Sequence, residues 1–234
     1  MFRLLSAAAI ASATMLGAAH AATMSGIFDV TVVNVTNLNS TESQATLENG
    51  EAAFAKANGV ENGFGGDDSV AIAGNFTFEG AIDFGTFDGS DQTTIQMWLD
   101  SSVGSSTTWN GTDLGGTILS KDGIGTNPGS ATTSFFFFEL VDAIGATDFV
   151  VTHDDGFAIY DGDDLVGGKK GPTSKQVTEV LGFDGGMFSL LYVATNGDPS
   201  VLNINATPVP LPAGLPLLLA GLGGLAVLRR RQKA

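Results

Sequence analysis

The sequence predicts a mainly β protein, and three observations carry that prediction. Short runs of β-branched and aromatic residues with partly alternating polarity recur along the chain, residues 26–36 and 147–153 among them. Turn pairs such as Asp-Gly and Asn-Gly separate the runs, and glycine supplies 32 of the 234 residues. Only residues 40–59 combine alanine and glutamate with helix-start and helix-stop residues. We therefore expect a β-sandwich or jelly-roll body with one short N-terminal helix.

The strand-like runs follow one another at the spacing of a two-sheet fold. They are residues 26–36, 70–85, 93–102, 132–142, 147–153, 157–162, 175–183, 186–195 and 199–207. The helix at 40–59 ends at Gly59, and Gly50 is a point where it can break. The Gly-, Ser- and Thr-rich residues 102–131 are expected to form a surface loop that contains a hairpin.

Four consecutive phenylalanines, Phe135 to Phe138, indicate a strand that is covered on both faces. Side chains alternate along a strand, so each face receives two rings, which suits a central strand of a two-layer fold. The alternative is that one pair of rings faces a partner surface. We expect Trp98 and Trp109 to belong to the core rather than to form sugar-stacking platforms, with Trp109 the more exposed of the two.

The first 21 residues predict a secretory signal peptide. Arg3 supplies the positive charge, residues 4–18 are apolar, and Ala19-His20-Ala21 offers small residues at the two positions that a signal peptidase needs. Cleavage is expected after Ala21. A mitochondrial presequence is the alternative, but it would carry more arginine and a shorter apolar run.

The last 27 residues, 208–234, predict a transmembrane helix. Residues 214–228 carry no charge but span only about 22 Å, short of the hydrocarbon core of about 30 Å. A start at Val209 brings the segment near full length, and the basic residues that end it are Arg229, Arg230 and Arg231. The positive-inside rule places this end in the cytoplasm and residues 22–207, the extracytoplasmic domain, outside.

The order of motif, apolar helix and arginines resembles the VPLPA-CTERM sorting signal, a variant of the PEP-CTERM class of exported Gram-negative bacterial proteins. The residues that carry the motif are Val209, Pro210, Leu211, Pro212 and Ala213. The resemblance implies cleavage near the motif by an exosortase-type membrane protease and release to the cell surface or the extracellular polysaccharide matrix. The alternative is a plain single-span membrane anchor.

Charge narrows the range of partners. All 25 acidic residues lie in residues 22–207, where five lysines are the only basic residues. Nucleic acid and anionic lipid both require a basic face, so neither is an expected partner. The acidic charge favours cations or neutral sugars as partners, or serves solubility alone. The chain has no cysteine, which excludes a disulfide framework and thiol chemistry.

The stretch HDDGFAIYDGDD, residues 153–164, is the strongest candidate site. Two tight turns at Asp155-Gly156 and Asp161-Gly162 would explain most of its aspartates. The turns do not explain Asp154, which stands next to Asp155, and carboxylates are ligands that Ca²⁺ prefers. Because neighbouring side chains of a strand point to opposite faces, both can reach one ion only where the backbone is irregular, at a bulge or a cis peptide.

Residues 149–166, followed by residues 190–204, resemble the PA14-type β-sandwich. Some members of that family are calcium-dependent lectins in which paired aspartates hold the ion and the ion holds sugar hydroxyls, whereas others bind no sugar. The resemblance implies that Asp154 and Asp155 are the pair and that Asn196 is the ligand from a neighbouring loop. Asn196-Gly197 is also an ordinary turn pair, which is the alternative.

Three functions follow from the sequence. The first is Ca²⁺-assisted binding of carbohydrate, an extracellular polysaccharide, and the second is a structural matrix or surface protein with no small ligand. A glycan hydrolase is the third, although no local sequence singles out a catalytic pair. His153 is the only histidine after residue 21, so no zinc cluster is expected, and the aspartates at 161–164 lack the spacing of an EF-hand.

Overall fold

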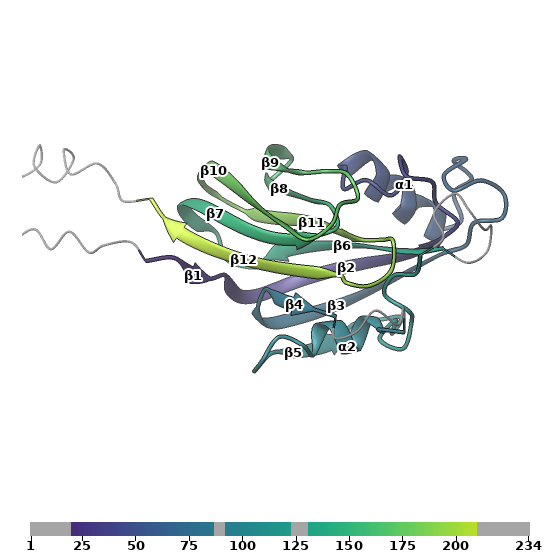
Figure 1. Ribbon diagram of the computed structural model, residues 1–234, viewed down its shortest axis with the longest axis horizontal. Coiled ribbons are helices and arrows are strands. Elements are labelled where there is room, and N and C mark those ends of the chain that lie inside the picture. The colour runs from purple at the N-terminus through teal and green to yellow at the C-terminus, as the bar shows by residue number, and fades with distance from the viewer. Residues whose placement is uncertain (1–19, 87–91, 123–130, 210–234) are drawn as a thin grey trace, which may run out of the picture.

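The computed structural model describes residues 20–86, 92–122 and 131–209 of the chain. Two β-sheets face each other, and helix α1 covers the outer face of one of them (Figure 1). The mainly β sandwich that the sequence predicts is therefore confirmed.

The larger sheet has seven strands in the order β5-β3-β2-β6-β11-β8-β9, and all of its pairs are antiparallel. The central strands are long and rich in β-branched or aromatic residues, as expected for strands buried on both faces. In chain order the strands are β2 Ser25–Thr36, β3 Ala71–Ala81, β5 Ser106–Trp109, β6 Thr132–Leu140, β8 Phe157–Asp161, β9 Asp164–Lys169 and β11 Phe188–Ala194.

The smaller sheet has five strands. β12 lies between β7 on one side and the short strands β1 and β4 on the other, and β10 pairs with the far edge of β7. The strands are β1 Ala22–Thr23, β4 Asp83–Gly85, β7 Ile144–Asp154, β10 Gln176–Gly186 and β12 Val201–Pro208.

The main core fills the space between the sheets. Phe136 and Phe138 point into it from β6, and Phe149 and Ile204 face them from the smaller sheet. Trp98 is fully buried and stacks on Tyr192 of β11 with ring centroids 5.3 Å apart, which confirms its predicted core position.

A second apolar cluster lies on the outer face of the larger sheet, under helix α1 Leu47–Ala57. Thr46 caps the helix by accepting a hydrogen bond from the Asn49 N–H at 3.2 Å. The buried Gly50 lies against the ring of Phe137. Phe135 is also buried in this cluster, so β6 is covered on both faces as predicted, and Gly50 marks a close contact inside the helix rather than a break.

Two sequence expectations were wrong in detail. Residues 93–102 form helix α2 Ile95–Leu99 instead of a strand, because Thr94 accepts a hydrogen bond from the Met97 N–H and starts a helical turn. The first helix begins at Leu47 rather than near residue 40. Trp109 is half-buried against Phe76 and more exposed than Trp98, as predicted.

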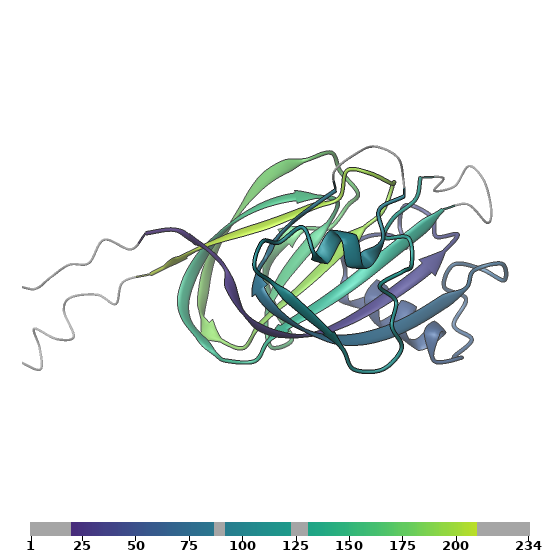
Figure 2. The same ribbon diagram turned by 90° about the horizontal axis from the view of Figure 1, so that it is seen from below.

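The described chain begins and ends at the same end of the sandwich. Ala22 of β1 pairs with Ala206 of β12, and both ends of the described chain leave this side of the molecule in Figures 1 and 2. The predicted signal peptide and the sorting motif from Pro210 onward, with Arg229, Arg230 and Arg231, lie outside the described residues. Within the described ranges, no helix has the length and apolar character needed to cross a membrane.

Candidate functional site

Asp154 and Asp155 lie where the chain crosses from one sheet to the other. β7 ends at Asp154 and pairs with strands of the smaller sheet, whereas β8 begins at Phe157 and belongs to the larger sheet. The Asp154-Asp155 peptide bond is cis. Because β7 and β8 belong to different sheets, the hairpin alternative is wrong at Asp155-Gly156. Gly162, with a φ of 58°, does form the tight turn between β8 and β9.

Gly156 lets this crossing pass close to a neighbouring segment. A Cβ atom at this position would lie 2.3 Å from the Lys170 carbonyl oxygen, a distance that no side chain tolerates. The same carbonyl accepts a hydrogen bond from the Ala45 N–H at 2.8 Å, so it is held in place from the far side. The glycine therefore serves close packing of backbone on backbone.

The two aspartate side chains line one pocket of about 370 Å³. Residues of three segments form its walls: the crossing at 154–155, the loop at 172–174 and the loop at 195–199. Asp154 is 6% exposed and Asp155 is 1% exposed. Neighbouring side chains of a regular strand face opposite sides. The cis peptide bond between the two residues is one of the irregularities that the sequence hypothesis named, and both residues line the same pocket.

Asp155 ties the three walls together. Its Oδ1 accepts a hydrogen bond from the Thr173 N–H at 3.0 Å, and its Oδ2 accepts one from the Thr195 N–H at 2.9 Å. The Asn196 side-chain amide lies 3.5 Å from Oδ1. The carboxylate therefore organises the pocket as well as lining it.

Burial disfavours the ionised form of both carboxylates. Loss of hydration raises the pKa of Asp155 to about 7, and the neighbouring Asp154 charge adds to the increase, against the hydrogen bonds from Thr195 and Thr173. Burial likewise raises the pKa of Asp154 to about 6, against the opposing effects of the Lys175 backbone and ammonium. A cation between the two carboxylates would offset both the repulsion and the lost hydration.

The backbone beneath the pair is held from the core side. The Tyr192 hydroxyl donates to the Asp154 carbonyl, and the Asp155 carbonyl oxygen lies 2.5 Å from Nδ1 of His153. Nε2 of His153 lies 2.8 Å from the Thr178 hydroxyl, so both ring nitrogens are engaged. His153 is completely buried, and burial lowers its pKa.

The third wall carries Asn196 on a braced loop. Asn196 adopts a left-handed φ of 63°, and the Gly197 N–H donates to the Ser120 hydroxyl at 2.8 Å. The Thr93 hydroxyl donates to Asp198 at 3.2 Å, and the Trp98 indole donates to the Ser200 carbonyl at 3.0 Å. Residues in and around α2, a segment that the sequence predicted as a strand, thus position the loop at 195–199 that carries Asn196, the predicted metal ligand.

The donor set suits a hard cation. Asp154 and Asp155 supply carboxylate oxygens, and the exposed Asn196 amide presents its oxygen after a half-turn of the side chain. In the described ranges, no three residues among His, Cys, Asp and Glu come together as a metal site. Ca²⁺ here would therefore take its remaining oxygens from backbone, water or a ligand, an arrangement that leaves room for sugar hydroxyls.

The structure brings together the three predicted site residues, Asp154, Asp155 and Asn196. Sequence reasoning missed the wall at 172–174, which follows the pair by 18 residues and carries no motif. It also missed Tyr192 and Lys175. The hydroxyl of a tyrosine on an otherwise apolar strand was the one available signal, because a buried Tyr hydroxyl needs a hydrogen-bond partner.

Comparison with known proteins gives two similar solved structures. One is described as a PA14 sugar-binding domain from an RTX adhesin, with a TM-score of 0.43, 16% identity and coverage of 76% of this chain and 88% of that chain. The other is the PA14 domain of the MpAFP antifreeze protein, with a TM-score of 0.39, 18% identity and coverage of 78% and 85%. No family model and no curated protein sequence matches the chain.

Proposed function

We propose that residues 22–207 form a carbohydrate-binding domain in which Asp154, Asp155 and Asn196 hold Ca²⁺, and that the ligand is an extracellular polysaccharide. One observation carries the proposal: two adjacent, buried carboxylates line the same pocket, beside an exposed amide. The ion would supply a centre for sugar hydroxyls, which replace water in its coordination shell. The pocket of about 370 Å³ is large enough for one sugar residue of a chain that continues into solvent.

Thermal unfolding with calcium and with chelator tests the metal. An ion that binds only the folded state raises the melting temperature by mass action. We expect a calcium-dependent rise in the full chain, lost in Asp155→Ala and kept in Asp163→Ala, an exposed aspartate at the neighbouring turn. Equal melting temperatures with calcium and chelator would overturn the proposal. Glycan binding that disappears in chelator would support its second half.

A structural role without a small ligand is the second candidate, and the hydrogen bonds of Asp155 favour it. A carboxylate that accepts hydrogen bonds from the Thr173 and Thr195 N–H groups has a structural role even without an ion, because it joins three segments of the chain. Under this alternative, Asp155→Ala lowers the melting temperature equally with calcium and with chelator. The hydrolase alternative predicts release of reducing sugar, and no observation favours it over binding.

The proposal extends to the route of export. Residues 1–21 would be removed as a signal peptide, and residues 208–234 would be recognised in the membrane by an exosortase-type protease and delivered to the cell surface or matrix. Its support is the sequence order of Val209 to Ala213, the apolar segment and the arginines. Replacing Arg229, Arg230 and Arg231 by glutamine should stop processing, measured as the mass of the cell-associated protein. An unchanged mass pattern would contradict this route.

A further inference from the structure

The lysines of residues 22–207 are distributed very unevenly. This part of the chain has 25 acids and five lysines, and three lysines, Lys169, Lys170 and Lys175, flank the pocket wall at 172–174. A fourth, Lys121, follows Ser120, whose hydroxyl accepts the Gly197 N–H of the opposite wall. Lys56 is the exception, and its ammonium donates to the carbonyls of Phe64 and Gly66.

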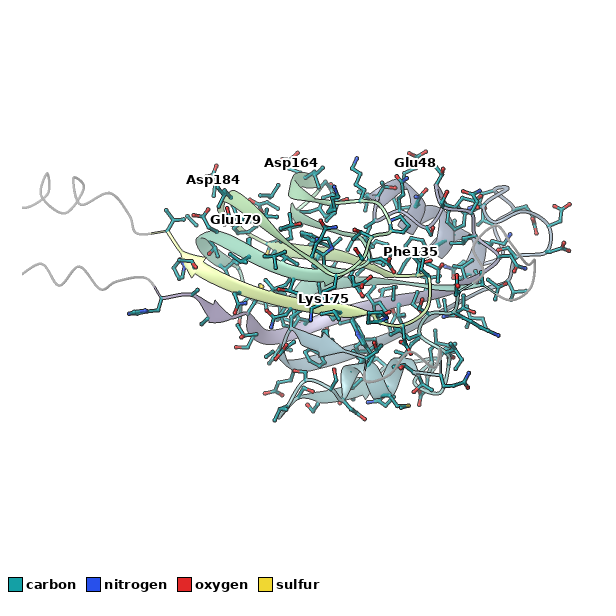
Figure 3. The ribbon with its side chains drawn as sticks, viewed as in Figure 1. Glu48, Phe135, Asp164, Lys175, Glu179 and Asp184 are labelled. Atoms are coloured by element: carbon teal, nitrogen blue, oxygen red, sulfur yellow. The ribbon has the colours of Figure 1, made fainter. Side chains whose placement is uncertain are left out.

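Electrostatic interactions and one backbone contact connect these lysines to the aspartate pair and the residues on either side of it. The Lys175 ammonium acts electrostatically on Asp154, and the Lys169 ammonium acts on His153. The backbone of Lys170 packs on Gly156, the residue after the pair. Lys169, Lys170 and Lys175 all have exposed side chains, and Figure 3 shows Lys175 at the opposite end of β10 from Asp184.

The local charge balance changes when an ion binds. Without an ion, Asp154 and Asp155 oppose the lysines, and Asp198 adds a third carboxylate to the pocket wall. A divalent cation neutralises the pair, and the three exposed lysines that flank residues 172–174 in the chain then outnumber Asp198, the remaining carboxylate of the pocket wall. The calcium-loaded pocket is then a region of positive potential on an otherwise acidic domain, and such a region attracts anions.

Resting on the calcium site proposed above, we propose that the ligand is an anionic polysaccharide built from uronic acid residues, with Lys175 at the rim pairing with the sugar carboxylate. A carboxylate oxygen is both a hard ligand for Ca²⁺ and a partner for an ammonium group. A uronate at the ion therefore satisfies both parts of the site. A neutral sugar uses the ion alone.

The test compares trigalacturonate with its methyl ester, in which neutral ester groups replace the charged carboxylates. Calorimetric titration of the full chain in excess calcium should show the free acid bound more tightly, with a preference that shrinks as salt is added. Lys175→Met should weaken binding of the free acid by about two- to fivefold, the range of an exposed ion pair, and leave the methyl ester unaffected. Val103→Glu is the matched control, because it changes net charge equally at a residue that is 96% exposed and does not line the pocket.

The outcomes separate the two proposals. Calcium-dependent binding of both probes with equal affinity overturns the uronate preference and leaves carbohydrate binding intact. A calcium-dependent melting shift with no binding of either probe also overturns the uronate preference, while the metal site stands. Binding of the free acid that persists in chelator shows a simple anion site and overturns it too. Absence of any calcium shift overturns the calcium site and the uronate proposal together.

Discussion

At the scale of single residues, the candidate site combines two acidic side chains with the backbone N–H groups that donate to one of them. Two adjacent aspartates predict a cation site, because like charges repel unless something separates them, and the pair can be read from the sequence. Thr173 and Thr195 contribute backbone N–H groups, which every residue except proline carries. No sequence pattern identifies them in advance, so this half of the site required the structure.

The raised pKa values predict how stability depends on pH. Asp155 has a folded-state pKa of about 7, above its unfolded value. Its stabilising contribution to the free energy of unfolding is therefore fully present below about pH 4 and is lost as the pH rises through about 7. We expect the free energy of unfolding in chelator, relative to Asp155→Asn, to fall over this window. Urea unfolding at a series of pH values measures it. The buried His153, whose lowered pKa acts in the opposite direction, is common to both proteins and cancels in the difference.

Calcium should abolish most of the fall in the free energy of unfolding with rising pH, because it binds the ionised carboxylates and stabilises the folded state by mass action. A wild-type curve that parallels the Asp155→Asn curve in chelator would contradict the inferred pKa. A fall that persists in excess calcium would contradict the metal site instead.

Tyr192→Phe tests the support beneath the pair. The change removes a buried hydroxyl that donates to the Asp154 carbonyl, so we expect a loss of about 1 kcal/mol in the free energy of unfolding. It should also weaken calcium binding, because the Asp154 backbone loses its anchor. Tyr160→Phe is the matched control on β8, since the chain has only these two tyrosines. Equal calcium affinity in both variants would show that Tyr192 serves stability alone.

At the scale of elements, the sequence predicts strands well and short helices poorly. The runs around β2, β7, β8, β10, β11 and β12 alternate or are continuously apolar, and the structure has strands there. Residues 93–102 also contain Ile, Met, Trp and Leu, but Thr94 caps a helical turn and Trp98 is buried in the main core. Tertiary packing determines the secondary structure of so short a segment, because its local preference for helix or strand is weak.

Gly156→Ala tests the crossing between the sheets. The new Cβ would lie 2.3 Å from the Lys170 carbonyl, which is itself fixed by Ala45, so the backbone must shift. We expect a loss of about 1–3 kcal/mol in the free energy of unfolding together with weaker calcium binding. Gly171→Ala, in the same loop as Lys170, has no atom within 4 Å of the new Cβ and should be close to neutral. Equal effects of the two changes would contradict this account of the crossing.

At the scale of the whole molecule, the pocket and the chain ends lie at opposite ends of the smaller sheet. Val201 of β12 pairs with Asp154, and Pro208 pairs with Thr147 seven residues further along. At about 3.3 Å per residue, this places the end of β12 roughly 23 Å from the aspartates along the strand. Figure 1 shows the chain leaving β12 at the end where β1 begins. Attachment through residues beyond 208 would therefore present the pocket away from the attachment surface.

Site-specific labelling tests this orientation, and the absence of native cysteine makes each introduced thiol unique. A bulky maleimide on Ser174→Cys, in the pocket wall, should block the calcium-dependent melting shift and glycan binding. The same label on Thr207→Cys, near the end of β12, should leave both unchanged, because it lies about 20 Å along the strand from the aspartates. Protein immobilised through its C-terminus should likewise bind ligand as well as protein in solution. If the label at residue 207 blocks binding as the label at residue 174 does, the ligand surface must extend over the whole smaller sheet, and the pocket alone cannot be the binding site.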